Sequence, residues 1–152
     1  MGAEDRLREL GIDLPPPAAP VASYVPVSVA GGLAFVAGQV PLEDGAAMVT
    51  GRLGAELATE EGATWARRCA LQALAALRAE LGSLDRVAGI AKVTVWVAST
   101  DDFTEQPKVA NGASDLLVDV FGDAGKHARA AVAAPVLPLG APVEVELIAE
   151  IA

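Results

Sequence analysis

An isolated arginine followed by closely spaced glutamates is the feature of this sequence best suited to chemistry. Arg129 stands alone in the small apolar run ARAAVAA, and Glu144 and Glu146 interrupt the apolar segment VEVELIAEI. Removing an unpaired charge from water costs several kcal/mol, so an arginine that faces a sheet surface requires a partner. That partner is either a structural carboxylate or an anionic ligand, because the planar guanidinium matches a carboxylate bidentately.

The overall composition disfavours several classes of site. With 152 residues, of which 53% are hydrophobic, the chain fits one domain with a substantial core. Its 11 Lys and Arg residues against 20 Asp and Glu give a net charge of −9, which opposes binding to nucleic-acid phosphates. The single cysteine, Cys69, and the single histidine, His127, are too few for a disulfide or a His/Cys metal site. We therefore expect no metal and no nucleic-acid partner.

The N-terminal segment predicts a helix and a linker rather than a targeting signal. The stretch MGAEDRLREL mixes acidic and basic residues, and no apolar run in the chain reaches the roughly 18 residues that a membrane span needs. We therefore expect, by elimination, a cytoplasmic protein without a membrane segment. Residues 3–10 have a helical pattern and LPPPAAP follows them, so we assign residues 1–23 to an N-terminal helix and a Pro-rich linker, an appendage to the main domain of residues 24–152.

Hydrophobic periodicity predicts the order strand, strand, helix, strand, helix, strand, strand for the main domain. The predicted elements are two strands around the Gly31–Gly32 turn, a long helix within 57–82, a strand at 87–99, a helix at 107–122, and strands near 129–134 and 142–151. A short segment, residues 48–53, is a candidate for one more strand. This order indicates an α+β fold, a mixed sheet with two helices on one face.

The last predicted strand separates an apolar side from a carboxylate side. Alternation places Val143, Val145 and Leu147 on one side, and Glu144, Glu146 and Ile148 on the other. By the same parity Arg129, Ala131 and Ala133 share one side of the preceding strand. If the two strands are antiparallel neighbours, Arg129 and Glu144 lie on the same surface of the sheet, where small residues leave room for a ligand.

Several segments together resemble the RidA (YjgF-like) family. They are, in order, SYVP, FVAGQVPL, AKVTVWVAS, KVANGASDLL, ARAAV, LPLG and VEVELIAEI, and they cover roughly residues 24–152. The resemblance implies a chorismate-mutase-like fold that assembles as a homotrimer, with ligand clefts between the subunits. Family members of this kind hydrolyse reactive 2-imino acids to 2-oxo acids and ammonia, a reaction for which the resemblance implies no metal or organic cofactor. The N-terminal extension and ANGASDLL resemble a longer branch of the family.

The resemblance also implies roles for five residues. Arg129 corresponds to the arginine that clamps the substrate carboxylate, and Glu144 to the carboxylate that positions the attacking water. Tyr24, Gly38 and Asn111 correspond to the tyrosine, glycine and asparagine that line the cleft. Active deaminases usually read Arg-Ser-Cys and carry Ser or Thr before the cleft glycine, whereas this chain has Ala130 and Ala131 after the arginine, and Ala37 before Gly38.

These departures keep other interpretations open. The chain could bind small carboxylates without catalysis, or, less in keeping with its net charge of −9, act as a ribonuclease. Arg129 could pair with a glutamate across a subunit boundary, and Glu144 could be a solvated strand carboxylate. Tyr24 could be a packed aromatic residue, and Asn111 could satisfy free amides in the first turn of its helix. For the remaining candidates we expect a loop position for His127, a small apolar role for Cys69, and packing roles for Trp65 and Trp96.

Overall fold

The computed structural model describes residues 1–19 and 22–152, so Pro20 and Val21, both within the predicted N-terminal linker region, lie outside the described residues. The helices are α1 (Ala3–Leu10), α2 (Thr59–Leu81) and α3 (Gln106–Phe121), with short 3₁₀ turns η1 (Leu84–Arg86), η2 (Gly122–Gly125) and η3 (Pro138–Gly140). The strands are β1 (Val27–Ala30), β2 (Leu33–Gln39), β3 (Leu42–Glu43), β4 (Ala46–Ala47), β5 (Val87–Ala98), β6 (Ala128–Ala134) and β7 (Val143–Ile151).

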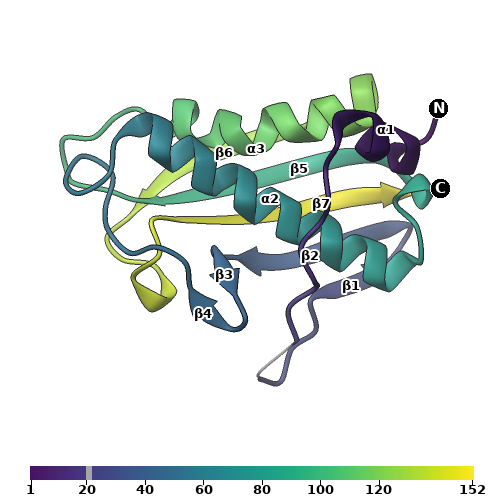
Figure 1. Ribbon diagram of the computed structural model, residues 1–152, viewed down its shortest axis with the longest axis horizontal. Helices are drawn as coiled ribbons and strands as arrows, with labels where there is room; N and C mark the ends of the chain where they lie inside the picture. Colours follow the sequence, from purple (N-terminus) through teal and green to yellow (C-terminus); the bar gives the residue numbers. More distant parts are fainter. Residues whose placement is uncertain (20–21) are drawn as a thin grey trace.

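Five of these strands form one mixed sheet in the order β1-β2-β7-β5-β6. The pairing of β5 with β6 is parallel, whereas the pairs β1–β2, β2–β7 and β5–β7 are antiparallel. Helices α2 and α3 lie side by side over one face of this sheet (Figure 1). The α+β fold with two helices on one face is therefore confirmed.

The hairpins differ from expectation at one place. The tight turn between β1 and β2 is confirmed, since Gly31 and Gly32 have φ values of 58° and 78°. The candidate strand at 48–53 is wrong, because the small hairpin consists of β3 and β4 and ends at Ala47. Its turn uses Asp44 and Gly45, both with positive φ, and this turn chemistry places the hairpin before residue 48.

The core lies between the sheet and the two long helices. Val143, Val145, Leu147 and Ala149 of β7 are all buried, whereas Glu146 and Glu150 on the opposite side are exposed. The predicted two-sided character of the last strand is thus confirmed. No helix of the described residues lies on the other side of the sheet, and we refer to it as the open face.

A glycine sets the distance between the two long helices. A Cβ atom on Gly112 of α3 would lie 1.9 Å from the carbonyl oxygen of Ala63 in α2. Only glycine permits this approach of one backbone to the other. The contact holds α3 beside α2 and above the edge strand β6.

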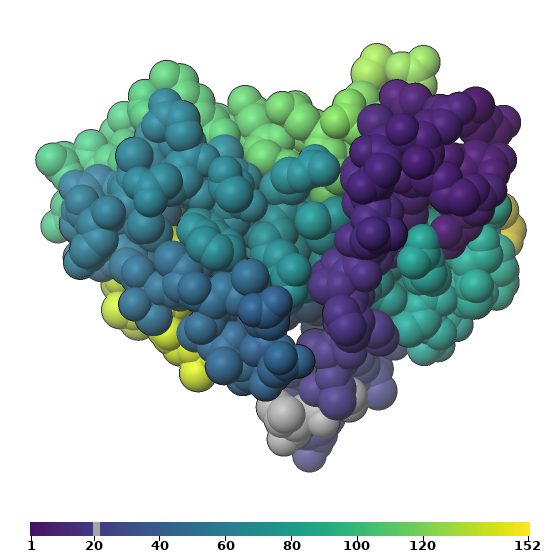
Figure 2. Space-filling model, viewed as in Figure 1, coloured from purple at the N-terminus to yellow at the C-terminus, as the bar shows by residue number. Residues whose placement is uncertain are grey.

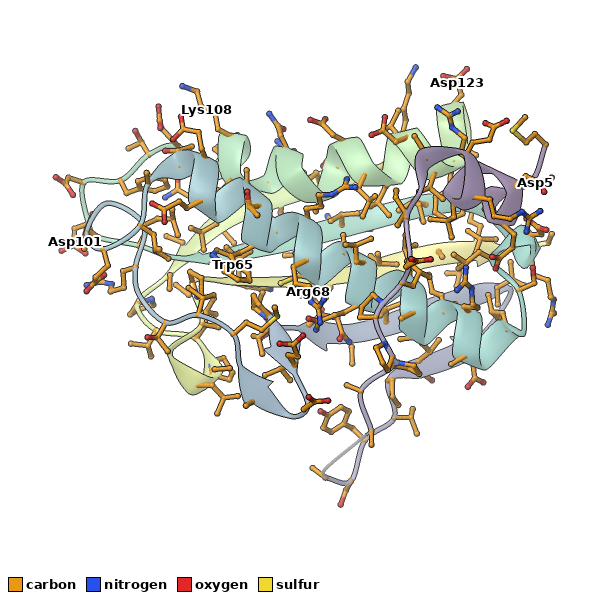
Figure 3. All side chains as sticks on the ribbon, in the orientation of Figure 1. Asp5, Trp65, Arg68, Asp101, Lys108 and Asp123 are labelled. Atoms are coloured by element: carbon orange, nitrogen blue, oxygen red, sulfur yellow. The ribbon has the colours of Figure 1, made fainter. Side chains whose placement is uncertain are left out.

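A polar network fixes the corner that follows β2. The Gln72 side chain on α2 donates to the Val40 carbonyl at 2.8 Å and accepts from the Leu42 amide at 3.0 Å. Arg68, one turn earlier, donates to the Leu42 carbonyl at 2.8 Å and points from α2 toward this corner (Figure 3). Because the network satisfies buried polar groups, the end of β2 has a defined position relative to α2.

Helix α1 packs on the body of the protein, which its interpretation as an appendage did not anticipate. Leu7 is buried in the main core, and the Glu4 carboxylate pairs with Arg78 of α2 at 2.6 Å. That ion pair lowers the pKa of Glu4. The N-terminal segment then crosses the helix layer (Figure 2). The division of the chain after residue 23 stays a prediction.

The predicted packing roles of Trp65, Cys69 and Trp96 are confirmed for the first two residues only. Trp65 packs against the core and Cys69 is fully buried on α2, as expected. Trp96 is different, because it lies on the open face with 36% of its surface exposed. Within residues 1–19 and 22–152, no helix is long and apolar enough to cross a membrane.

The packing of α1 can be tested by truncating its buried leucine. We expect Leu7→Ala to lower the free energy of unfolding by about 2 to 5 kcal/mol, the usual cost of removing a buried leucine side chain. Leu10→Ala is the matched control, since Leu10 is 37% exposed, and its effect should stay within about 0.5 kcal/mol. Urea denaturation of the two variants measures the difference, and equal small effects would show that α1 contributes little to the fold.

Candidate functional site

Arg129 lies near the start of the edge strand β6 and points toward the helices. In the parallel ladder it is level with Val93 of β5, which is fully buried under the helix layer. Residues level with one another in neighbouring strands point to the same face of a sheet. The Arg129 side chain therefore meets α3 and does not reach the open face.

The guanidinium of Arg129 is hydrogen-bonded along one side. Its Nη1 donates to Asn111 Oδ1 at 2.8 Å and to Ser114 Oγ at 3.1 Å, which uses both Nη1 hydrogens. Nη2 donates one hydrogen to the Pro107 carbonyl at 3.4 Å. No acceptor in the described part of the chain bonds Nε. Nε–H and one Nη2–H therefore have no acceptor in the described chain, and together they can bond a carboxylate.

Glu144 lies on the open face, near the start of β7. It is level with Trp96 of β5 and is half-buried. Removal from water raises the pKa of Glu144, and the negative charge of Glu146 on the same face raises it further. Glu146 in turn accepts a hydrogen bond from Trp96 Nε1 at 3.1 Å. Glu144 is thus a carboxyl group that binds a proton more readily than an exposed glutamate.

Gly38 and Glu144 lie in contact. The ladder between β2 and β7 shifts register between Val36 and Gln39, which brings the backbone of Gly38 against the glutamate. A Cβ atom on Gly38 would lie 2.9 Å from Glu144 Oε2. The structure therefore unites two of the predicted site residues on the open face, next to the corner that Gln72 fixes.

The expectation that Arg129 and Glu144 share a sheet surface is wrong within one chain. Strand β5 lies between β6 and β7, so the two strands are not neighbours. Their backbones are roughly 14 Å apart, from the two strand spacings and the three-residue offset along β5, and their side chains point to opposite faces. Two half-sites result: Arg129 with Asn111 beside α3, and Glu144 with Gly38 on the open face.

The other predicted residues have different surroundings. Tyr24 precedes β1 and is 54% exposed, so it is not a packed aromatic residue in this chain. Asn111 lies beyond the first turn of α3 and binds Arg129, so a role in satisfying first-turn amides is excluded. Ala131 packs against the core on the same side of β6 as Arg129.

Two residues beside Arg129 were not identified from the sequence. His127 lies in a loop, as expected, but its Nε2 is 2.9 Å from Ser114 Oγ and its Nδ1 is 2.6 Å from the Gly125 carbonyl oxygen. Ser114 follows Asn111 by three positions, the spacing that puts two residues on one face of a helix. That spacing was the available signal for Ser114. The histidine pairing depends on the η2 turn, which no pattern in the sequence predicts.

In the part of the chain that the structure describes, no group of three or more His, Cys, Asp or Glu side chains is placed to hold a metal ion. Cys69 is buried, and its surroundings raise the pKa of the thiol, mainly through desolvation. The chemistry available at the half-sites is therefore that of a guanidinium, a half-buried carboxyl group, and the Ser114 and His127 side chains.

Comparison with known proteins identifies the family. Residues 4–151 match the family described as "YjgF/chorismate_mutase-like, putative endoribonuclease". The chain belongs to this YjgF family. Protein TCP17 of Trypanosoma cruzi is a relative that is 49% identical over 146 residues, which cover 95% of this chain and 91% of TCP17. The family match includes α1, so this helix lies within the similarity.

Solved structures agree with the YjgF assignment. A "putative endoribonuclease" from Shewanella oneidensis superposes with a TM-score of 0.94 at 36% identity, covering 99% of this chain and all of that one. Protein Atu1372 of Agrobacterium tumefaciens gives a TM-score of 0.90 at 42% identity, covering 99% and 93% of the two chains. E. coli TdcF, whose structure contains bound serine, shares the fold at 22% identity with a TM-score of 0.62, covering 90% and 94%.

The repulsion between the two glutamates of the open face predicts a measurable change. We expect Glu146→Gln to lower the pKa of Glu144, because it removes the neighbouring negative charge that disfavours ionisation. Carboxyl ¹³C NMR titration of Glu144 measures the shift. Glu150→Gln, an exposed change farther along β7, should leave this titration unaltered, and an equal shift in both variants would contradict the assignment to Glu146.

Proposed function

We propose that this YjgF-family protein is a homotrimer that binds small 2-imino and 2-oxo acids in clefts between subunits and hydrolyses the imino acids to 2-oxo acids and ammonia. The proposal rests on the hydrogen bonding of the Arg129 guanidinium. Its Nη1 side is bound to α3, and its Nε–Nη2 edge is available. Such an edge fits the carboxylate that every 2-imino and 2-oxo acid carries.

The open face supports assembly. Phe35, Trp96 and Val132 on this face are 41%, 36% and 38% exposed, and no helix of the described chain covers them. A shallow hollow on the same face is lined by Phe35, Lys92, Thr94, Glu146 and Ile148. Apolar surface gathered on one face favours burial against another protein surface. Contact between copies of this face would bury these side chains.

Assembly would also unite the two half-sites. Because Arg129 and Glu144 point to opposite faces of one sheet, a small ligand that contacts both must lie between two subunits. Arg129 and Asn111 of one copy would then hold the ligand carboxylate, while Glu144 and Gly38 of the next copy would line the other wall. The serine bound by E. coli TdcF, a small carboxylate, is in keeping with a ligand of this class.

Glu144 is suited to activate water in this arrangement. A water molecule attacks the carbon of the protonated imine while Glu144 accepts one of its protons, and the C=N π electrons move to nitrogen to give a neutral carbinolamine. Glu144 then returns the proton to the amine nitrogen, and the C–N bond breaks to release ammonia. The hydroxyl proton passes to Glu144 as the C=O bond forms, and ammonia or water then takes it up. A raised pKa brings the carboxyl closer to the working pH, where proton transfer is most effective.

Two other functions, a non-catalytic binder and a ribonuclease, can be distinguished from the hydrolase by experiment. Ala37 and Ala131 lack the polar side chains that the imine-hydrolysing members carry, which favours a trimer that binds 2-oxo acids without turnover. Relatives named as putative endoribonucleases favour RNA as the substrate, but the net charge of −9 opposes binding to the phosphates of RNA. Ammonia release from imines generated by a dehydratase supports the hydrolase, binding without release supports the binder, and cleavage of RNA would replace both. Cytoplasmic residence, too, stays a prediction.

The assembly has a direct test. We expect size-exclusion chromatography with light scattering to give three times the 15.4 kDa chain mass. Phe35→Glu places a charge in the proposed contact and should shift the protein toward monomer, while Glu43→Gln, an exposed change outside the main sheet, should not. A parent protein that stays monomeric at all concentrations tested would rule out the shared cleft.

Arg129 is tested by binding. We expect Arg129→Ala to abolish detectable binding of 2-oxobutanoate by calorimetry, because charge-assisted hydrogen bonds are worth roughly 1.5 to 3 kcal/mol each and two are lost. Arg129→Lys keeps the charge but not the paired donors, and we expect it to weaken binding as well. Affinity unchanged in both variants would refute the anchor.

Glu144 is tested by turnover. We expect Glu144→Gln to slow imine hydrolysis by about 10² to 10⁴, the usual contribution of a positioned proton acceptor. Binding of 2-oxobutanoate should persist, since Arg129 is unchanged. Glu146→Gln is the necessary control on the same face, and hydrolysis at the parent rate by Glu144→Gln would show that Glu144 is not the base.

A further inference from the structure

A chain of hydrogen bonds runs from the main chain to Arg129. His127 Nδ1 lies 2.6 Å from the Gly125 carbonyl oxygen, which can only accept. Nδ1 therefore carries the hydrogen, and in the neutral ring Nε2 has a lone pair. Ser114 Oγ lies 2.9 Å from Nε2, so the serine hydroxyl donates to the histidine.

This direction leaves the serine oxygen free to accept. Arg129 Nη1 donates to it at 3.1 Å, which completes a continuous series from the Gly125 carbonyl through His127 and Ser114 to the guanidinium. With a neutral imidazole each group has one role, because reversing any bond would then set two donors or two acceptors against each other. The series therefore defines the orientation of Arg129.

The starting point of the series packs closely against α3. A Cβ atom on Gly125 would lie 2.2 Å from the Leu117 carbonyl oxygen, so the η2 turn packs directly on the backbone of α3. Ser114 belongs to the same helix, one turn earlier. Lys108 and Asp123, which are labelled in Figure 3, lie near the two ends of α3. The Gly125 carbonyl and the serine are thus both positioned by α3.

We propose that Ser114 and His127 are positioning residues that orient the Arg129 guanidinium so that its Nε–Nη2 edge is presented to the ligand carboxylate. This inference rests on the proposed function of Arg129 as the carboxylate anchor. Without the serine, Nη1 would keep only Asn111, an exposed side chain, as its partner. A long side chain on an edge strand then regains rotamer freedom, which a ligand must remove again on binding.

The same Ser–His contact could instead activate a nucleophile. The donor count favours positioning, because one lone pair of Ser114 Oγ already accepts from a cation. A guanidinium bonded to the oxygen lowers its nucleophilicity. Covalent labelling of Ser114 by a fluorophosphonate probe would overturn the positioning role.

Four variants test whether Ser114 and His127 act through their hydrogen bonds or only by filling space. Ser114→Ala removes the bridging hydroxyl, and Ser114→Thr keeps it. His127→Asn places an amide where Nδ1 lies and can still donate to Gly125, but has no group at the Nε2 position. His127→Gln places an amide oxygen near the Nε2 position and can accept from Ser114. Asp115→Asn, an exposed change next to the serine, is the control.

Calorimetric titration with 2-oxobutanoate gives the first measurement. We expect Ser114→Ala and His127→Asn to weaken binding roughly 10-fold to 100-fold, the scale of a misplaced contact group. Ser114→Thr and Asp115→Asn should resemble the parent, and His127→Gln, which keeps the acceptor for Ser114 but loses the bond to Gly125, should weaken binding less than His127→Asn. Far-UV circular dichroism and thermal melting confirm that the variants are folded. Parent-like affinity in folded Ser114→Ala and His127→Asn would overturn the inference while leaving the anchor intact.

A second measurement needs no ligand. In ¹⁵N NMR spectra of the free protein, we expect the Nη1 hydrogens of Arg129 to give resolved signals that Ser114→Ala and His127→Asn broaden and Ser114→Thr restores. If the parent binds no 2-oxo acid but these signals behave as stated, the proposed function fails and the positioning holds. If the signals are already averaged in the parent, the positioning fails whatever the binding result.

Discussion

The parallel pairing of β5 with β6 is the constraint on which the candidate site depends. It sets Arg129 level with Val93, a residue buried under the helices, and so directs the guanidinium to α3. The next residue, Ala130, is level with Thr94, which faces the same surface as Glu146. A shift of one residue in this ladder would therefore move the arginine to the open face, away from Asn111 and Ser114.

The secondary structure was predictable because its signals are local, whereas the site geometry was not. The Gly31–Gly32 turn, the long helix α2 and the alternation in β7 depend on residues close in sequence, and each was found where expected. The relation between Arg129 and Glu144 depends instead on the position of β5 in the sheet. Strand β5 ends some thirty residues before β6 begins, yet it lies between β6 and β7. Strand parity gave the correct grouping of residues within each strand, but it contains no information about the order of strands in the sheet.

The separation of the two half-sites on opposite faces of one sheet affects how Ala37 and Ala131, which replace polar residues of the imine-hydrolysing members, are interpreted. Ala131 lies on the helix side of β6 and packs against the core, close in sequence to Arg129, while Ala37 precedes the glycine that touches Glu144. Each of the two half-sites thus lacks one polar side chain: the Arg129 half-site at Ala131 and the Glu144 half-site at Ala37. Near Arg129 a hydroxyl and an imidazole are still present, but α3 and the loop before β6 supply them.

The burial of Cys69 has a practical meaning for the protein in solution. The thiol is fully enclosed between α2 and β7, where it donates to the Val143 carbonyl at 3.7 Å, and desolvation raises its pKa. A protonated, enclosed sulfur reacts with neither oxidants nor alkylating reagents until the helix separates from the sheet. Because Cys69 is the only cysteine of the chain, its modification by a thiol reagent reports the opening of the core and nothing else. The native sequence therefore carries its own single-site probe of conformational opening, without an engineered label.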